Sequence, residues 1–136
     1  MATYKYNQKI LIVEDEEVML GTLTDNLMQA GFGNILKARN GETGLELALK
    51  ENPDLILLDI VMPIMNGMDM LSKLREDKQG KNIKVILLTN LTANDGIMAG
   101  VIKDNPSYYV IKADYSIDDV IEKVKVTLGI ESLSVQ

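Results

Sequence analysis

Acidic side chains are the groups in this sequence whose type and spacing best predict chemistry. Glu14 and Asp15 directly follow an apolar run that ends at Val13, and Asp59 directly follows another that ends at Leu58. Two carboxylates about 5 Å apart repel each other by roughly 3 kcal/mol at an effective dielectric near 20, so a group of them favours a bound cation. Oxygen ligands suit a hard divalent ion, and Mg²⁺ keeps water positions that a phosphate can take. These residues therefore predict a magnesium site.

Two other reactive groups also follow apolar runs. Thr89 comes directly after Val85–Leu88, and Lys112 directly after Tyr108–Ile111. A lysine offers a fixed positive charge and a threonine a neutral donor, and both can stabilise charge on a transferring phosphoryl group. Taken singly, such residues are more often caps, turns or exposed charges, but their coincidence after four runs indicates one shared site. The remaining run ends in residues 37–40, Lys-Ala-Arg-Asn, and adds no comparable group.

The composition narrows the chemistry that remains. The chain has 136 residues, of which 46% are hydrophobic and 25% charged, as is typical of one globular domain. The absence of His and Cys excludes histidine bases, His-ligated zinc, thiolate metal sites and disulfides. A net charge of −6 disfavours nonspecific nucleic-acid binding. No apolar stretch approaches ~18 residues, and the polar N-terminus lacks the apolar core of a signal peptide, so we expect a cytoplasmic protein without membrane insertion.

The elements between these groups must position them. Five short apolar runs predict strands at Lys9–Val13, Asn34–Lys37, Leu55–Leu58, Val85–Leu88 and Tyr108–Ile111. Apolar residues at three- and four-residue spacing predict five helices. Their stripes are Leu20, Leu23, Leu27 and Ala30; Leu45, Ala48 and Leu49; Met70, Leu71 and Leu74; Ile97, Met98, Val101 and Ile102; and Ile117, Val120, Ile121, Val124 and Leu128. For the last helix, Ser116 with Asp119 predicts a capped start, and Gly129 predicts the end.

The alternation of strand and helix predicts an α/β fold. Helices of this length between strands require parallel pairing through right-handed crossovers, which gives one doubly wound five-stranded parallel sheet with five helices. Such sheets carry their functional groups past the carboxyl ends of the strands, where the candidate residues lie. We expect a single domain over residues 9–129, with a short lead-in at residues 1–8 and a short tail at residues 130–136.

Two segments carry motifs of a known family. They are Ile10–Glu16 (ILIVEDE) and Leu57–Gly67 (LLDIVMPIMNG). Together with the strand-ending Thr89 and Lys112, they make the sequence resemble the response-regulator receiver domain of two-component signalling, which has the CheY-like, flavodoxin-like fold. The resemblance covers nearly the whole chain, about residues 9–128, and implies the strand order 2-1-3-4-5.

The resemblance also implies a role for each residue of the site. The aspartate accepts a phosphoryl group, the acidic pair and one backbone carbonyl support Mg²⁺, and the threonine and lysine contact the phosphoryl oxygens. A tyrosine on the last strand rotates inward as the threonine moves. The implied residues are, for phosphoryl transfer, Asp59, Thr89 and Lys112; for the metal, Glu14, Asp15, Asp59 and the carbonyl of Val61; and for the switch, Thr89 and Tyr109.

Two residues depart from the family's pattern. Ala113 follows Lys112 where the family usually has proline. A cis bond before alanine costs about 2.5–4 kcal/mol, so we expect a trans bond and a different path for this loop. Asn90 stands where the family usually has a small residue after the threonine, and we expect it either to narrow access to the phosphoryl group or to bond to it.

The expected function is that of a stand-alone receiver in a phosphorelay. Because the chain has no histidine, the phosphoryl donor must be another molecule. We expect the phosphohistidine of a sensor histidine kinase or a histidine phosphotransfer protein, or else a small phosphodonor. Phosphorylation of Asp59 would then switch binding to a downstream protein, or dimerisation through the face formed by the fourth helix, the fifth strand and the fifth helix. We expect a signalling phosphoacceptor that also catalyses its own phosphorylation and dephosphorylation, without direct nucleic-acid binding.

Three alternatives remain open. A degenerate receiver would act by protein–protein interaction without phosphorylation, and the departures at Asn90 and Ala113 motivate that alternative. A phosphatase with an aspartyl-phosphate intermediate usually needs a second aspartate two residues after the nucleophile, where this chain has Val61. A flavodoxin-like cofactor carrier would need a phosphate-binding loop after the first strand, where this chain has four acidic residues.

Overall fold

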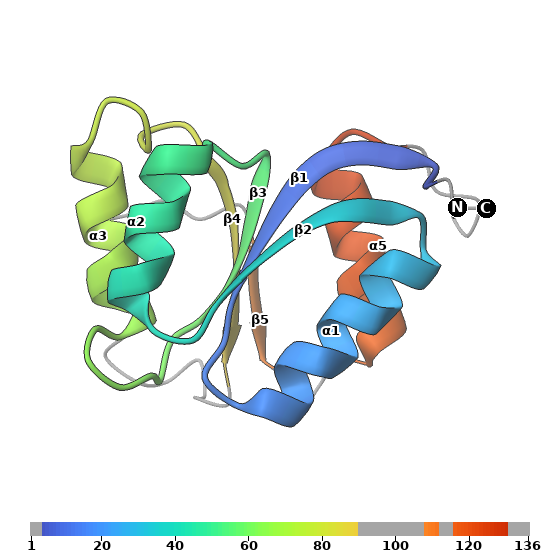
Figure 1. Cartoon of the computed structure of the whole chain (residues 1–136), viewed down its shortest axis with the longest axis horizontal. Helices are drawn as coiled ribbons and strands as arrows, with labels where there is room; N and C mark the ends of the chain where they lie inside the picture. The colour runs from blue at the N-terminus through green and yellow to red at the C-terminus, as the bar shows by residue number, and fades with distance from the viewer. Residues whose placement is uncertain (1–3, 90–107, 112–115, 131–136) are drawn as a thin grey trace.

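Strands alternate with helices as far as residue 89 in the computed structural model, which describes residues 4–89, 108–111 and 116–130. The elements are β1 (Tyr6–Val13), α1 (Glu17–Gln29), β2 (Phe32–Ala38), α2 (Gly41–Glu51), β3 (Leu55–Asp59), α3 (Gly67–Glu76), β4 (Lys84–Thr89), β5 (Tyr108–Ile111) and α5 (Ile117–Thr127) (Figure 1). The helix predicted around residues 97–102 lies outside the described residues. Among the described helices, none is both long and apolar enough to cross a membrane.

The described strands all belong to one parallel sheet with the order β2-β1-β3-β4-β5. This is the order that the family resemblance implied. The register places Val13 of β1 beside Leu58 of β3, and Asp59 beside Leu88 of β4. Thr89 in turn pairs with Ile111 of β5. The carboxyl ends of these four strands therefore meet at one edge of the sheet.

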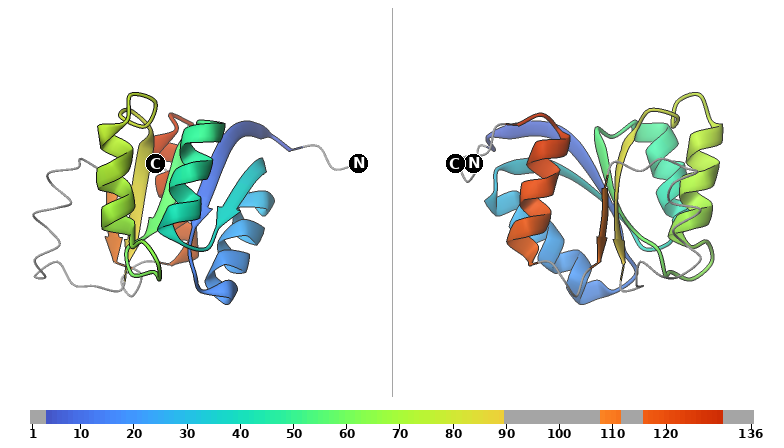
Figure 2. Two further views of the ribbon diagram at one scale, coloured as in Figure 1. Left: turned by 60° about the vertical axis from the view of Figure 1, so that its left-hand side comes forward. Right: turned by 180° about the vertical axis from the view of Figure 1, so that it is seen from behind.

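Helices cover both faces of the sheet, with α2 and α3 on one face and α1 and α5 on the other (Figures 1 and 2). Each face has its own apolar core. Ile56 and Leu58 of β3 pack toward α2 and α3, whereas Leu55 and Leu57 pack toward α1 and α5. The buried helical residues include Ala48, Met70, Leu71 and Leu74 on the first face, and Leu20, Leu23, Leu27, Val120, Ile121 and Val124 on the second.

The predicted helix ends agree with the structure where local signals define them. The helix α5 begins at a capping box in which Ser116 and Asp119 satisfy each other's backbone N–H groups. Gly129 follows the helix with a φ of 75°, a conformation that favours glycine. In α2, by contrast, only Ala48 of the predicted stripe is buried, while Leu45 and Leu49 are partly buried at the edge of the core.

Two strands begin earlier than predicted. The strand β1 starts at Tyr6 rather than Lys9, so the predicted lead-in of residues 1–8 contains its first three residues. The strand β2 likewise starts at Phe32 rather than Asn34. The cause is a nonlocal contact, because the Tyr6 and Phe32 rings pack with centroids 4.8 Å apart and the Tyr6 N–H donates to the Gly31 carbonyl at 2.8 Å. A short polar segment gives no sign of such pairing in the sequence.

Candidate functional site

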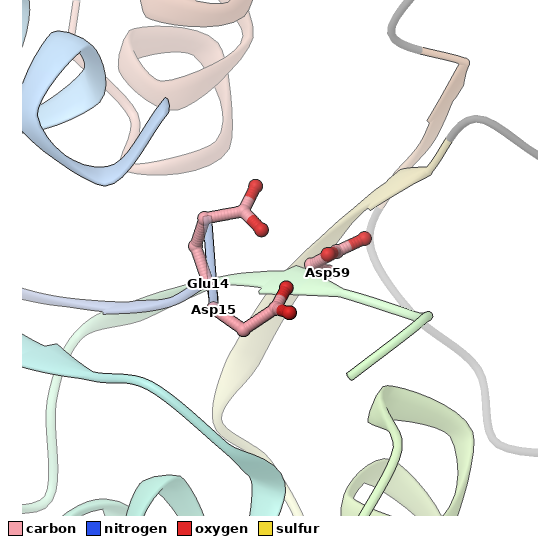
Figure 3. A group of neighbouring side chains, drawn as sticks. All are labelled: Glu14, Asp15 and Asp59. Carbon is pink, nitrogen blue, oxygen red and sulfur yellow. The ribbon is translucent and has the colours of Figure 1, made fainter. Parts of the chain in front are cut away.

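Three carboxylates come together at the carboxyl ends of β1 and β3. Because Val13 pairs with Leu58, the next residues, Glu14 and Asp59, emerge side by side from adjacent strands. One carboxylate oxygen from each of Glu14, Asp15 and Asp59 lies within 4.8 Å of the others (Figure 3). The predicted meeting of these side chains is therefore confirmed.

The acidic group is largely withdrawn from water. Glu14 is 1% exposed and Asp59 is 7% exposed, whereas Asp15 is half-buried. The Glu14 carboxylate accepts a hydrogen bond from the backbone N–H of Glu16 at 3.4 Å. Burying charged carboxylates next to one another is costly unless they are paired or bind a cation.

The geometry and donor types fit a hard divalent ion. An octahedral Mg²⁺ with bonds of about 2.1 Å holds its ligand oxygens roughly 3–4.2 Å apart. The three carboxylates, within 4.8 Å of one another, need only a small adjustment or a bridging water to reach that spacing. Their oxygens are the donor class that such an ion prefers. Glu14, Asp15 and Asp59 are therefore the residues that would hold Mg²⁺.

The loop between β3 and α3 keeps Asp59 at the end of its strand. The Gly67 N–H donates to the Ile60 carbonyl at 2.8 Å, which folds the loop back on itself. A Cβ on Gly67 would overlap the backbone carbonyl of Asp59. Only glycine allows this approach, and Asn66, just before it, caps α3 by accepting the Asp69 N–H at 2.9 Å.

The other predicted site residues lie at or beyond the same edge. Val61 lies two residues past Asp59 with its side chain 61% exposed. Thr89 is the last residue of β4, and Tyr109 pairs with Leu87 from β5. Lys112, Ala113 and Asn90 lie outside the described residues. The roles implied for these residues by the family resemblance stay predictions.

The turn between β2 and α2 contacts the site, although sequence reasoning found no site residue there. The Arg39 Nη2 donates to the backbone carbonyl of Asp15 at 3.2 Å, across 24 positions of sequence. The Gly41 N–H donates to the Met65 carbonyl at 2.9 Å. An arginine or glycine that bonds to a distant backbone carbonyl has no sequence signature, and the only local signal is Asn40, which caps α2.

The fold is an α/β fold with a parallel sheet, and buried carboxylates lie just past the carboxyl ends of its strands. In proteins of this class, ligands bind at that edge of the sheet. The sequence pattern of the response regulator receiver domain matches residues 10–125. The chain therefore belongs to the response regulator receiver family, as its motifs indicated.

Individual relatives agree with that membership. The polar-differentiation response regulator DivK of Brucella anthropi is 32% identical over 122 residues, which cover 90% of this chain and 97% of DivK. The probable transcriptional regulatory protein TcrX of Mycobacterium tuberculosis is 31% identical over 119 residues, which cover 88% of this chain and 49% of TcrX. The chain thus spans about half the length of TcrX, and smaller shares of several other curated relatives.

A solved structure shows the same fold. The CheY-like receiver domain protein of Methanospirillum hungatei has a TM-score of 0.82 and 25% sequence identity, with 91% of this chain and 95% of that chain covered.

Proposed function

We propose that this chain accepts a phosphoryl group on Asp59, with Mg²⁺ held by Glu14, Asp15 and Asp59, and that the phosphorylated form binds a downstream protein differently. The observation that carries the proposal is the approach of the three carboxylate oxygens to within 4.8 Å of one another at the strand ends. Membership of the receiver family supports the same chemistry.

Asp59 would act as the nucleophile. One of its carboxylate oxygens attacks the phosphorus of the donor and forms a P–O bond, while the bond from phosphorus to the donor breaks and its electron pair leaves with the donor. When the donor is a phosphohistidine, the broken bond is P–N and the imidazole nitrogen keeps the pair. Because β3 is buried along its whole length, it holds this carboxylate in a fixed position for attack.

Glu14 and Asp15, together with Asp59, would hold the metal ion. The ion, once bound, neutralises charge that develops on the transferring phosphoryl oxygens. Thr89 and Lys112 would contact the same oxygens, and the Val61 carbonyl would complete the ligand set. The position of Thr89 at the end of β4, next to the strand that carries Asp59, supports its part in this scheme.

The partner on the donor side would be a histidine kinase or a phosphotransfer protein, because this chain has no histidine. Phosphorylation of Asp59 would then shift Thr89 and Tyr109 between two states, and so transmit the change from the site toward β5.

A stretch of histidine kinase P4 from Formosa agariphila is 41% identical to this chain over 90 residues, 6% of that protein's length. The role is that of a signalling phosphoacceptor rather than an enzyme that acts on a metabolite.

The test is chemical phosphorylation followed by intact-protein mass measurement. Incubation with acetyl phosphate and Mg²⁺ should add about 80 Da, and the adduct should disappear with Asp59→Asn or with excess EDTA. Asp25→Asn is the matched control, since Asp25 is an exposed aspartate on α1. If the wild type forms no adduct at any Mg²⁺ concentration, the proposal fails and binding without phosphorylation becomes the better account.

A further inference from the structure

The turn between β2 and α2, residues 38–41, contacts both loops that carry the carboxylates. On one side, the Glu14 N–H donates to the Ala38 carbonyl at 3.0 Å, and the Arg39 Nη2 donates to the Asp15 carbonyl at 3.2 Å. On the other side, the Gly41 N–H donates to the Met65 carbonyl at 2.9 Å. The β2–α2 turn therefore lies between the loop of Asp15 and the loop of Asp59.

The contact on the Asp59 side is sterically tight. A Cβ on Gly41 would overlap the backbone carbonyl of Met65 and would lie 3.0 Å from the Met65 Cβ. A backbone carbonyl cannot move aside without moving the loop that carries it. One turn further along α2, a Cβ on Gly44 would lie 2.9 Å from the Val13 side chain and 3.0 Å from the Met70 sulfur. The first turn of α2 thus packs closely against β1 and α3 as well.

We propose that the β2–α2 turn sets the distance between the Asp15 and Asp59 carboxylates, with Arg39 as a positioning residue for Asp15 and Gly41 as the fixed contact to the loop of Asp59. The inference rests on the proposed function, because the property that this distance controls is the affinity for Mg²⁺. Outer residues that orient metal ligands typically change metal affinity about 10- to 100-fold when removed.

The charge of Arg39 allows positioning to be separated from simple electrostatics. The Arg39 guanidinium lies beside the backbone of Asp15 and repels a cation bound by the Asp15 carboxylate, so loss of the charge alone would tighten Mg²⁺ binding. Loss of the hydrogen bond to the Asp15 carbonyl would instead loosen the ligand geometry and weaken binding. The two effects have opposite signs, and the direction of the change in affinity therefore identifies the role.

The first experiment measures the Mg²⁺ dissociation constant of the full chain by NMR titration of backbone amides. Arg39→Gln should raise the dissociation constant about threefold to tenfold, at or below the low end of the usual range, because the bond is exposed. Arg39→Lys should recover part of the affinity, since an ammonium can still donate to the carbonyl. Lys37→Gln is the matched control, because Lys37 is also exposed and lies two residues before Arg39, near the end of β2. It removes the same charge and should not raise the constant.

The second experiment uses the tight contact. Gly41→Ala should raise the Mg²⁺ dissociation constant by about tenfold or more, while Gly21→Ala, whose added Cβ meets nothing within 4 Å, should leave it unchanged. Thermal unfolding without Mg²⁺ checks that each variant is folded. If Gly41→Ala does not fold, the Mg²⁺ dissociation constants of the Arg39 variants test the proposal. A wild type that binds Mg²⁺ and an Arg39→Gln variant that binds as tightly or more tightly would overturn this inference alone. A wild type that does not bind Mg²⁺ overturns the proposed function together with it.

Discussion

Ile64 has a backbone conformation that its side chain disfavours. Its φ is 68°, in the left-handed region that a β-branched residue rarely adopts. The cost is roughly 1–2 kcal/mol, and burial does not offset it, because the side chain is 76% exposed. Hydrogen bonds of the surrounding loop hold the conformation, with the Met65 N–H donating to the Pro63 carbonyl at 2.7 Å.

Replacing Ile64 should therefore stabilise the protein. Asparagine adopts the left-handed region more readily than isoleucine, so Ile64→Asn should raise the free energy of unfolding in urea by about 0.5–1.5 kcal/mol. Val18→Asn is the control, because Val18 is also exposed, at 75%, but lies in α1. That change should stay within about 0.5 kcal/mol. A loss of stability in Ile64→Asn would show that the loop is not strained at this position.

At the residue scale, what could be predicted from the sequence depended on the kind of signal. Asp59 could be placed because a carboxylate after a buried strand must emerge at the sheet edge. The left-handed conformation of Ile64 could not be predicted, since among the residue types only glycine and asparagine indicate that conformation in a sequence. Arg39 could not either, because its partner is a backbone carbonyl 24 positions away.

Among the elements, α5 shows how local signals define a helix. The Ser116 hydroxyl accepts the Asp119 N–H, and the Asp119 carboxylate accepts the Ser116 N–H, both at 3.2 Å. The next turns bury Val120, Ile121 and Val124 against the sheet. The cap fixes where the helix begins, and so which residues face the core.

Loss of this cap should weaken the fold without changing the acidic site. Ser116→Ala should lower the free energy of unfolding by about 1 kcal/mol, measured in urea. The Mg²⁺ affinity should stay at the wild-type value, because the two hydrogen bonds of the cap join Ser116 and Asp119 and involve none of the three carboxylates. Ser116→Asp keeps a side-chain acceptor at the cap and should lose only part of that stability. Equal losses of unfolding free energy in the two variants would mean that the hydrogen bond accepted by the Ser116 hydroxyl does not stabilise the helix.

The elements differ in how far the sequence determines their ends. The start and end of α5 could be predicted because cap, stripe and glycine all lie within the segment itself. The starts of β1 and β2 could not, because they depend on the packing of Tyr6 against Phe32. Pairing between distant segments extends both strands beyond their apolar runs.

For the whole molecule, the acidic group exists only when β1 and β3 are paired. A ligand that binds the folded state but not the unfolded state stabilises the fold by mass action. At a Mg²⁺ concentration about 100 times the dissociation constant, the gain should be about 2.7 kcal/mol. The strand order that creates this linkage came from the family resemblance, since apolar runs alone show that strands alternate with helices but not which strands are neighbours.

Thermal unfolding with and without Mg²⁺ measures that gain. The midpoint temperature should rise with Mg²⁺, and NaCl at the same ionic strength should produce a much smaller change. Asp15→Asn should be more stable than the wild type without Mg²⁺, because one repelling charge is gone, and should gain less when Mg²⁺ is added. Equal shifts in the wild type and Asp15→Asn would argue against a metal site that includes this residue.

The burial of β3 also determines where this protein can be redesigned. Every residue from Leu55 to Asp59 is buried, and neighbouring residues point into different cores. An engineer who changed the strand to move Asp59 would disturb one core or the other. In the loop after it, the side chains of Val61 and Ile64 are exposed, and these two positions are open to variation. New selectivity can therefore be introduced around Asp59 by changing these two exposed positions, while the strand that carries Asp59 is left as it is.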